Sequence, residues 1–464
     1  MTLRLSPTVD RRRLLQQGAL LTGGLVVAGM RPGRVLAKER VTTLATSRPI
    51  GSLFAPGEGS VFVGTNHNNT SNPSEPANQI TMYRRAVDGQ LELIDSFATG
   101  GQGSGPGQRF AGDGLGAGNS VRLSTDNRWL FVTNAGSDTV TVFKVSSDGL
   151  EVVDIAPTGD GSHDHRFPNS VTQYERMVYV LNSADDGSIA GFTLSNEGHL
   201  TAMADSTRSL DANQRRFAPD ALLNPAQVAF TPDGSHLVVT IKDGPAVGLV
   251  GGVTPTGLGR VLVWNMDENG RPADDFVQTD LENRGPFGFS FDRNGHLLIA
   301  EFLGGGIEEI EGEKEPTAAA GSYTINKDGT LTPITPGVPN HQVDTCWLVN
   351  NGRYAYGANY TSGTISSYSI SDDGSLVLLE SAAGEAEDPG NEQGATPLDA
   401  RISQDDQFLY VVLSGAGKVA GWHIEDDGTL TKLGEFEGLP QAIDGDQASS
   451  DFSDLGSPAG IEVI

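Results

Sequence analysis

A four-strand pattern repeats along almost the whole chain and constrains the fold more than any other feature of the sequence. Each repeat ends in a tight turn of an acidic residue or Asn followed by Gly, and the seven turns are Asp88-Gly89, Asp148-Gly149, Glu197-Gly198, Asn269-Gly270, Asp328-Gly329, Asp373-Gly374 and Asp427-Gly428. Such dipeptides supply the positive φ angles that β-hairpins need. An alternating strand precedes each turn and ends in an aromatic residue: Tyr83, Phe143, Phe192, Trp264, Tyr323, Tyr368 and Trp422.

Seven copies of a four-strand unit are typical of one architecture, because a propeller blade is a four-stranded sheet of roughly 45 residues. The sequence therefore predicts an all-β fold, a seven-bladed β-propeller with four antiparallel strands per blade. Consecutive β-sandwich domains fit less well, since they would not repeat one unit seven times. Two segments, residues 49–52 and 457–461, resemble the inner strand that closes the ring, and the sequence leaves both open.

The N-terminal segment predicts export. Arg11, Arg12 and Arg13 precede a Gly-rich apolar run over residues 18–30, and residues 35–37 resemble a cleavage site. This arrangement is typical of a twin-arginine signal peptide, and the apolar run is too short to span a bilayer. We therefore expect a signal peptide over residues 1–37 and a single propeller domain over residues 38–464. The mature protein should be periplasmic or secreted, with no membrane insertion.

Charge and cysteine content narrow the range of partners. The formal net charge is −28, which disfavours nucleic acid and anionic lipid surfaces as partners. Cys346 is the single cysteine, so no intramolecular disulfide can form, and we interpret it as a small buried hydrophobic residue. We expect a monomer that acts on a small molecule.

The long insertions of the predicted blades all fall on one face. Turns between the first and second strands, and between the third and fourth, are short and define a short-turn face. The opposite, long-loop face carries residues 67–78, 100–118, 160–167, 204–223, 242–259, 303–316, 383–396 and 441–456. Long loops on a rigid scaffold commonly carry function, although neutral insertion is the alternative.

One loop on this face contains candidate catalytic residues. His163, His165 and Arg166 place potential bases and a cation next to one another, and histidine can transfer a proton near neutral pH. His67 and His341 lie on the same face as candidate substrate-binding residues. The alternative is a solvated loop whose histidines have no special role.

A second candidate set opens the inner strands and should surround the mouth of the central channel. Asn119, Asn169 and Gln227 are candidate substrate-binding residues, and Asp344 and Asp399 form a possible carboxylate pair or cation site. The alternative is that these groups cap strand ends and bind water. No cofactor is expected, with a divalent cation such as Ca²⁺ at the two aspartates as the alternative.

Residues 119–132, which read NSVRLSTDNRWLFV, resemble the opening of a blade in the 6-phosphogluconolactonase-type propeller lactonases. Residues 228–234 and 419–428 resemble the same family, which also includes fungal carboxymuconate cyclases. The resemblance extends over residues 44–464. It implies a lactonase, which is a carboxylic ester hydrolase acting on a cyclic ester.

Two departures from that family bear on the substrate. The phosphogluconolactonase branch carries His at the position of Asn119 and an Arg-His pair at the positions of Ala226 and Gln227. The loss of these cations indicates a neutral or weakly charged lactone, with His163 or His165 as base and Asn119 and Gln227 donating to the oxyanion. It also leaves a second hypothesis open, a non-catalytic propeller that binds a protein, a glycan or a cation.

Overall fold

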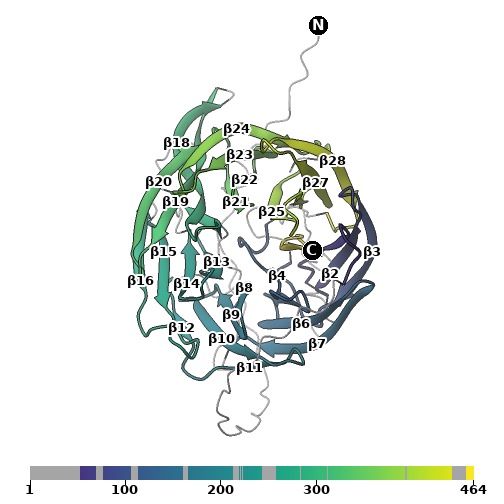
Figure 1. The fold of residues 1–464 in the computed structure, drawn as a ribbon, viewed down its shortest axis with the longest axis vertical. Helices are drawn as coiled ribbons and strands as arrows, with labels where there is room; N and C mark the ends of the chain where they lie inside the picture. Colours follow the sequence, from purple (N-terminus) through teal and green to yellow (C-terminus); the bar gives the residue numbers. More distant parts are fainter. Residues whose placement is uncertain are drawn as a thin grey trace, which may run out of the picture.

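Seven β-sheets form a ring (Figure 1). The computed structural model describes residues 53–68, 77–105, 113–159, 166–212, 219, 221, 223–242, 258–282, 284–310, 312–391, 394–441 and 456–464. Within them each sheet runs as four antiparallel strands, and the third sheet has one additional short strand. The predicted seven-bladed propeller is therefore confirmed. The predicted signal peptide, residues 1–37, lies outside the described residues.

The blades follow the chain, each from an inner strand outward. Blade 1 contains β29 (Ile461–Val463), β1 (Gly59–Gly64), β2 (Gln79–Arg85) and β3 (Leu91–Ala98), and blade 2 contains β4 (Val121–Leu123), β5 (Trp129–Asn134), β6 (Thr139–Ser146) and β7 (Gly149–Pro157). Blade 3 contains β8 (Pro168–Tyr174), β9 (Met177–Asn182), β10 (Ser188–Leu194), β11 (Leu200–Ala202) and β12 (Arg208–Ser209), and blade 4 contains β13 (Pro225–Phe230), β14 (His236–Ile241), β15 (Leu258–Asn265) and β16 (Val277–Glu282). Blade 5 contains β17 (Pro286–Phe291), β18 (Leu297–Ile310), β19 (Glu313–Ile325) and β20 (Leu331–Pro339). Blade 6 contains β21 (Thr345–Asn350), β22 (Tyr354–Asn359), β23 (Thr364–Ile370) and β24 (Leu376–Glu385), and blade 7 contains β25 (Pro397–Ile402), β26 (Phe408–Leu413), β27 (Lys418–Ile424) and β28 (Leu430–Glu437).

The C-terminal strand closes the ring. β29 pairs antiparallel with β1, with Phe62 opposite Glu462, so the end of the chain supplies the inner strand of the first blade. The sequence left two segments as candidates for the strand that closes the ring, and the C-terminal one supplies it. The buried Arg85 supports the closure, because its Nε donates to the Ile464 carbonyl at 3.1 Å and its Nη2 pairs with Asp405 of blade 7 at 3.1 Å.

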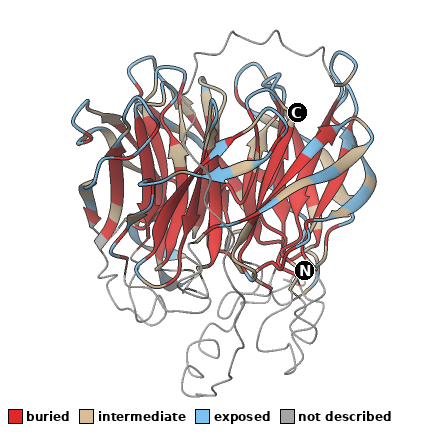
Figure 2. Ribbon diagram, turned by 90° about the horizontal axis from the view of Figure 1, so that it is seen from below, coloured by how far each residue is buried: buried red, intermediate tan, exposed pale blue. Residues whose placement is uncertain are grey.

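The core lies within and between the blades, as the buried middle strands in Figure 2 show. All seven predicted strand-ending aromatic residues are buried. Packing them between neighbouring sheets removes large apolar areas from water, which stabilises the ring. Six of the seven turn glycines have positive φ as expected; the exception is Gly149, which begins β7.

One expectation about the long-loop face was wrong. Residues 303–316 were expected to form a loop, but most of them extend β18 and β19 into a long hairpin, with Ile307 opposite Pro316. The segment is rich in Glu and Gly and lacks a clear alternating pattern, so its strands could not be predicted from the sequence. Over the described parts of the chain, no helix is long and apolar enough to cross a membrane.

Candidate functional site

Three neighbouring blades place a charged residue at the same level of their inner strands. Glu462 of β29 lies opposite Phe62, Arg122 of β4 opposite Phe131, and Arg401 of β25 opposite Tyr410. These partners occupy matching positions of the second strands, so the three charged side chains project toward the same part of the ring. We call the region enclosed by the inner strands the central channel.

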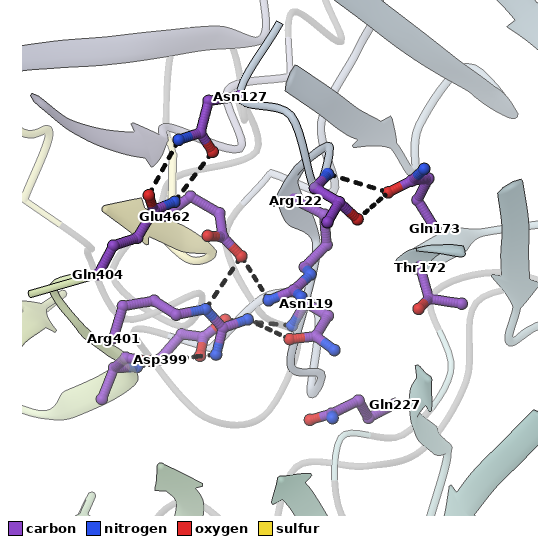
Figure 3. Close-up of polar contacts among 12 residues, drawn as sticks. Asn119, Arg122, Asn127, Thr172, Gln173, Gln227, Asp399, Arg401, Gln404 and Glu462 are labelled. Carbon is purple, nitrogen blue, oxygen red and sulfur yellow. Dashed lines mark hydrogen bonds and ion pairs between the residues drawn. The ribbon is translucent and has the colours of Figure 1, made fainter. Parts of the chain in front are cut away.

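The three charged residues form one connected cluster (Figure 3). Glu462 Oε1 accepts hydrogen bonds from Arg122 Nη1 and from Arg401 Nε, the latter at 3.0 Å. Arg401 Nη2 in turn donates to Asn119 Oδ1. Glu462 therefore holds the two guanidinium groups side by side, and Arg401 fixes the orientation of the Asn119 amide.

Asp399 extends this cluster toward the start of the inner strands. Its two carboxylate oxygens accept the backbone N–H groups of Asn119 at 3.2 Å and of Ala400 at 2.9 Å. Burial raises the pKa of Asp399 to about 6, against the opposing influence of the Arg401 charge and the two backbone hydrogen bonds. A carboxyl group with a pKa near 6 is mostly ionised at neutral pH yet basic enough to accept a proton.

The two arginines differ in their surroundings. Burial lowers the pKa of Arg122, and the attraction of Glu462 offsets this effect only in part. For Arg401, the attraction of Glu462 and Asp399 exceeds the effect of burial, so its pKa is raised. Both remain protonated at physiological pH. The Arg122 side chain is 33% exposed and that of Arg401 15%. Arg122 Nε is buried and has no hydrogen-bond partner, so the exposed part of this side chain lies toward its guanidinium end.

The other four blades carry uncharged residues at the same level. The register places Thr172 opposite Tyr179, Ala229 opposite Val238, Ser290 opposite Leu298 and Val349 opposite Tyr356. The channel therefore has a charged arc of Glu462, Arg122 and Arg401, and a neutral arc of Thr172, Ala229, Ser290 and Val349. Figure 3 shows Thr172 and Gln227 apart from the ion pairs.

Residues 113–118 cross the channel at its long-loop end, and we call them the plug. Their backbone is held from three sides of the ring: Ser457 Oγ accepts from Gly114 N at 3.0 Å, Asn224 Nδ2 donates to Leu115 O at 3.0 Å, and Trp347 Nε1 donates to Ala117 O at 3.2 Å. Leu115 and Ala117 are buried.

An amide pair spans the short-turn end above Glu462. Asn127 of blade 2 and Gln404 of blade 7 exchange two hydrogen bonds of 2.9 Å (Figure 3). In blade 1, which lies between them, the first two strands are β29 and β1, which are not consecutive in the sequence. The pair links the neighbouring blades across this break.

The structure brings together only some of the sequence-predicted residues. Asn119 and Asp399 meet in the cluster. Gln227 lies in the channel, but both ends of its amide bond the backbone of Phe289, at 2.7 and 3.1 Å, so it links β13 to β17. Asn169 Nδ2 donates to the Pro225 carbonyl at 2.8 Å and likewise joins two blades.

The remaining predicted residues lie elsewhere or outside the description. His341 pairs with Glu308 at 3.0 Å, and the His67 carbonyl accepts from Gly103 N at 2.7 Å. Arg166 sits between blades 2 and 3, where its backbone N–H donates to Asp138 at 2.8 Å. His163 and His165 lie outside the described residues.

The predicted cation site stays a prediction. Asp344 accepts a hydrogen bond from Thr361 Oγ1 of its own blade, whereas Asp399 faces Asn119. Within the described ranges, no group of three or more His, Cys, Asp or Glu side chains could hold a metal ion. Cys346 is buried, as expected, and burial raises the pKa of its thiol.

Sequence reasoning missed Arg122 and Glu462 as site residues. A signal was present, since each interrupts a short apolar strand, in Val121-Arg122-Leu123 and Ile461-Glu462-Val463, and Arg401 does the same in Ala400-Arg401-Ile402. A single charge between two buried apolar residues on a propeller's inner strand faces the channel, because successive side chains alternate in direction.

The sequence matches the family described as "Lactonase, 7-bladed beta-propeller" over residues 76–301 and 310–442, which is most of the chain. The chain belongs to this lactonase family. The match confirms the seven-bladed propeller lactonase family that the blade motifs resemble.

Solved structures share the propeller lactonase fold. A periplasmic gluconolactonase of Pseudomonas aeruginosa is 16% identical with a TM-score of 0.58, and the match covers 88% of this chain and 99% of that one. A protein of Lactobacillus plantarum gives 15% identity, a TM-score of 0.59 and the same coverage. At these identities the likeness shows the fold alone. An uncharacterized protein of Staphylococcus aureus is 30% identical over 93 residues, which is 19% of this chain and 26% of that relative.

Proposed function

We propose that this protein hydrolyses a neutral or weakly charged lactone in its central channel. The observation that carries the proposal is the cluster of Arg122, Arg401, Glu462, Asp399 and Asn119 inside a lactonase-family propeller. In the reaction, water adds to the lactone carbonyl and the ring C–O bond breaks. The ring oxygen then takes up a proton, and the product is a hydroxy acid.

The charges of the cluster favour an uncharged substrate. Two guanidinium groups face two carboxyl groups, Glu462 and Asp399, so the channel has little net charge to attract an anion. The net charge of −28 further disfavours a phosphorylated substrate. A lactone carbonyl needs only hydrogen-bond donors, and the cluster supplies them in the Arg122 guanidinium group and the Asn119 amide.

The residues can be given roles in the hydrolysis. The guanidinium group of Arg122, whose side chain is 33% exposed, stabilises the negative charge that develops on the carbonyl oxygen. The Asn119 amide, oriented by Arg401, is a second donor. Asp399 is the candidate base, acting through a water held beside Asn119, because its pKa lies near the operating pH. Glu462 positions both arginines.

The sequence also suggests an alternative general base and a cellular location for the protein. His163 or His165 would act from the long-loop face if the reaction took place there. The twin-arginine segment supports export to the periplasm or beyond. The gluconolactonase of Pseudomonas aeruginosa that shares the fold is a periplasmic protein.

A variant series tests the proposal. Hydrolysis of uncharged, carboxylated and phosphorylated lactones is followed by pH-stat for the wild type and for Arg122→Met. We expect turnover of uncharged lactones and a fall in kcat/KM of about 10²–10³-fold on loss of the Arg122 donor. Arg84→Met, the same change at an exposed site on β2, is the control and should behave as wild type.

The series also separates the alternatives. A His163→Ala/His165→Ala double variant that loses activity, together with an active Arg122→Met, would move the reaction to the long-loop face. No turnover on any of the lactones would overturn the proposed function and leave the non-catalytic binding propeller.

A further inference from the structure

We infer that Lys242 is a positioning residue for the proposed hydrolysis, and that it acts on Asn119 through the plug. The inference rests on the proposed function, in which the Asn119 amide donates to the developing oxyanion. It adds to that site a buried cation that is not a member of the charged cluster.

The plug has a sequence that does not fix its own conformation. Three of its six residues are Gly114, Gly116 and Gly118, and glycine loses more conformational freedom on ordering than any other residue. Gly116 has a φ of 57°, and Asn119, which follows the plug, has a φ of 63°, a conformation that is uncommon for residues other than glycine. Contacts with the ring must therefore hold the segment that leads into Asn119.

The ring contacts each residue of the plug after the first. Besides the three side chains that bond the plug at residues 114, 115 and 117, Lys242 Nζ donates to the Gly116 carbonyl, and the Ala226 carbonyl accepts from Gly118 N at 3.0 Å. Of these five contacts only that of Lys242 is charged, and a hydrogen bond with an ionised donor is about twice as strong as a neutral one. Lys242 therefore holds the chain firmly just before Asn119.

Lys242 and Asp113 bond the two backbone groups of one residue of the plug. Lys242 is 1% exposed, and its Nζ lies 3.8 Å from the centroid of the Phe287 ring. Asp113, the first residue of the plug, is buried as well, and its Oδ1 accepts from Gly116 N at 2.7 Å while Lys242 bonds Gly116 O. Burial raises the pKa of Asp113, and the charge of Lys242 opposes this effect. Removing the lysine alone would leave a carboxyl group buried without its cation, which is strongly unfavourable.

The plug connects this pair directly to the oxyanion donor. Asn119 follows Gly118, its backbone N–H donates to Asp399, and its Oδ1 accepts from Arg401, so Nδ2 is the end of the amide that can donate to a ligand (Figure 3). A displacement of about 1 Å in a positioned group can lower a rate by about 100-fold. Loss of Lys242 should therefore remove the contribution of Asn119 to the reaction.

A double-variant comparison tests this coupling. kcat and KM for an uncharged lactone are measured for Lys242→Met, for Asn119→Ala and for their combination. Lys242→Met alone should lower kcat by up to about 100-fold with little change in KM, because an oxyanion donor acts on the transition state. In the Asn119→Ala background the same change should lower kcat by about twofold or less, since the donor that it positions is gone. Lys144→Met, at an exposed lysine of β6, is the matched control and should behave as wild type.

Cys346 reports on the plug independently of turnover. It is the single cysteine of the chain, it is buried, and it belongs to the same apolar cluster as Leu115 and Ala117 of the plug. A maleimide should label the wild type slowly and Lys242→Met about tenfold faster or more, because the plug loses a charged hydrogen bond. Lys242→Met/Asp113→Asn should recover part of the protection, since no carboxyl group is then buried without its cation.

The outcomes separate this inference from the proposed function. Wild-type kinetics or wild-type labelling in Lys242→Met would overturn the inference and leave the proposed function intact. So would a loss of kcat that is as large in the Asn119→Ala background as in the wild type, because Lys242 would then act on another group. Should Lys242→Met fail to fold, Lys242→Met/Asp113→Asn takes its place in both measurements. Absence of hydrolysis by the wild type would overturn the proposed function and the inference together.

Discussion

At the residue scale, the candidate site depends on side chains that are distant in sequence. Arg122 meets Glu462 across 340 positions, and Asn119 meets Asp399 across 280. Three inner strands, β29, β4 and β25, supply the groups of the cluster together with the residues just before them, and no local motif contains the site. Asp399 is the residue whose ionisation should be visible in the kinetics, because burial raises its pKa to about 6.

The pH dependence of hydrolysis should follow Asp399. Below about pH 6 the carboxyl group is protonated and cannot accept a proton, so kcat/KM should fall roughly tenfold per pH unit there and level off above. Asp399→Asn should lower kcat/KM by about 10²–10⁴-fold and remove this inflection. A profile of kcat/KM from pH 4.5 to 8.5 measures both. An unchanged inflection in the variant would assign the proton transfer to another group.

The sequence predicted part of this site, for physical reasons. Asn119 and Asp399 open inner strands, and turn signals locate such positions along a repeat. Arg122 and Glu462 were not predicted as site residues, because their partners depend on the register of β4 and β29 and on which terminus closes the ring. Gln227 was predicted to bind substrate, and the structure shows its amide bonded to the backbone of Phe289, where it links two blades.

At the element scale, β29 is the strand on which both the fold and the site depend. It completes blade 1 and carries Glu462 between the fully buried Ile461 and the buried Val463. The strands with regular alternation and a Gly-containing turn were predictable, because those signals are local. The β18–β19 extension was not, because its Glu-rich sequence does not show which face is buried.

Weakening β29 should destabilise the whole ring. Ile461→Ala removes buried methyl groups and should lower the free energy of unfolding by about 2–4 kcal/mol. Ile307→Ala, at a half-exposed position near the tip of β18, is the matched control and should change it by less than about 0.5 kcal/mol. Chemical denaturation of the two variants compares these values. Equal stability would show that ring closure by β29 contributes little.

At the scale of the whole molecule, the propeller is a rigid ring that is plugged at one end. The backbone of the plug is bonded by side chains of Asn224, Trp347 and Ser457, which come from blade 4, blade 6 and the segment before β29. The sequence foresaw seven blades from seven turns. It placed function on the long-loop face because the insertions lie there, and this stays a prediction. No local pattern reveals that one insertion crosses the channel.

The most direct test of this account is a crystal structure of the protein with a lactam that matches a hydrolysed lactone in ring size and substituent. The lactam carbonyl replaces the ester carbonyl but resists hydrolysis. The account predicts the lactam in the central channel, its oxygen accepting a hydrogen bond from Arg122. A lactam bound instead at the long-loop face, with the Arg122–Glu462–Arg401 cluster empty, would contradict it.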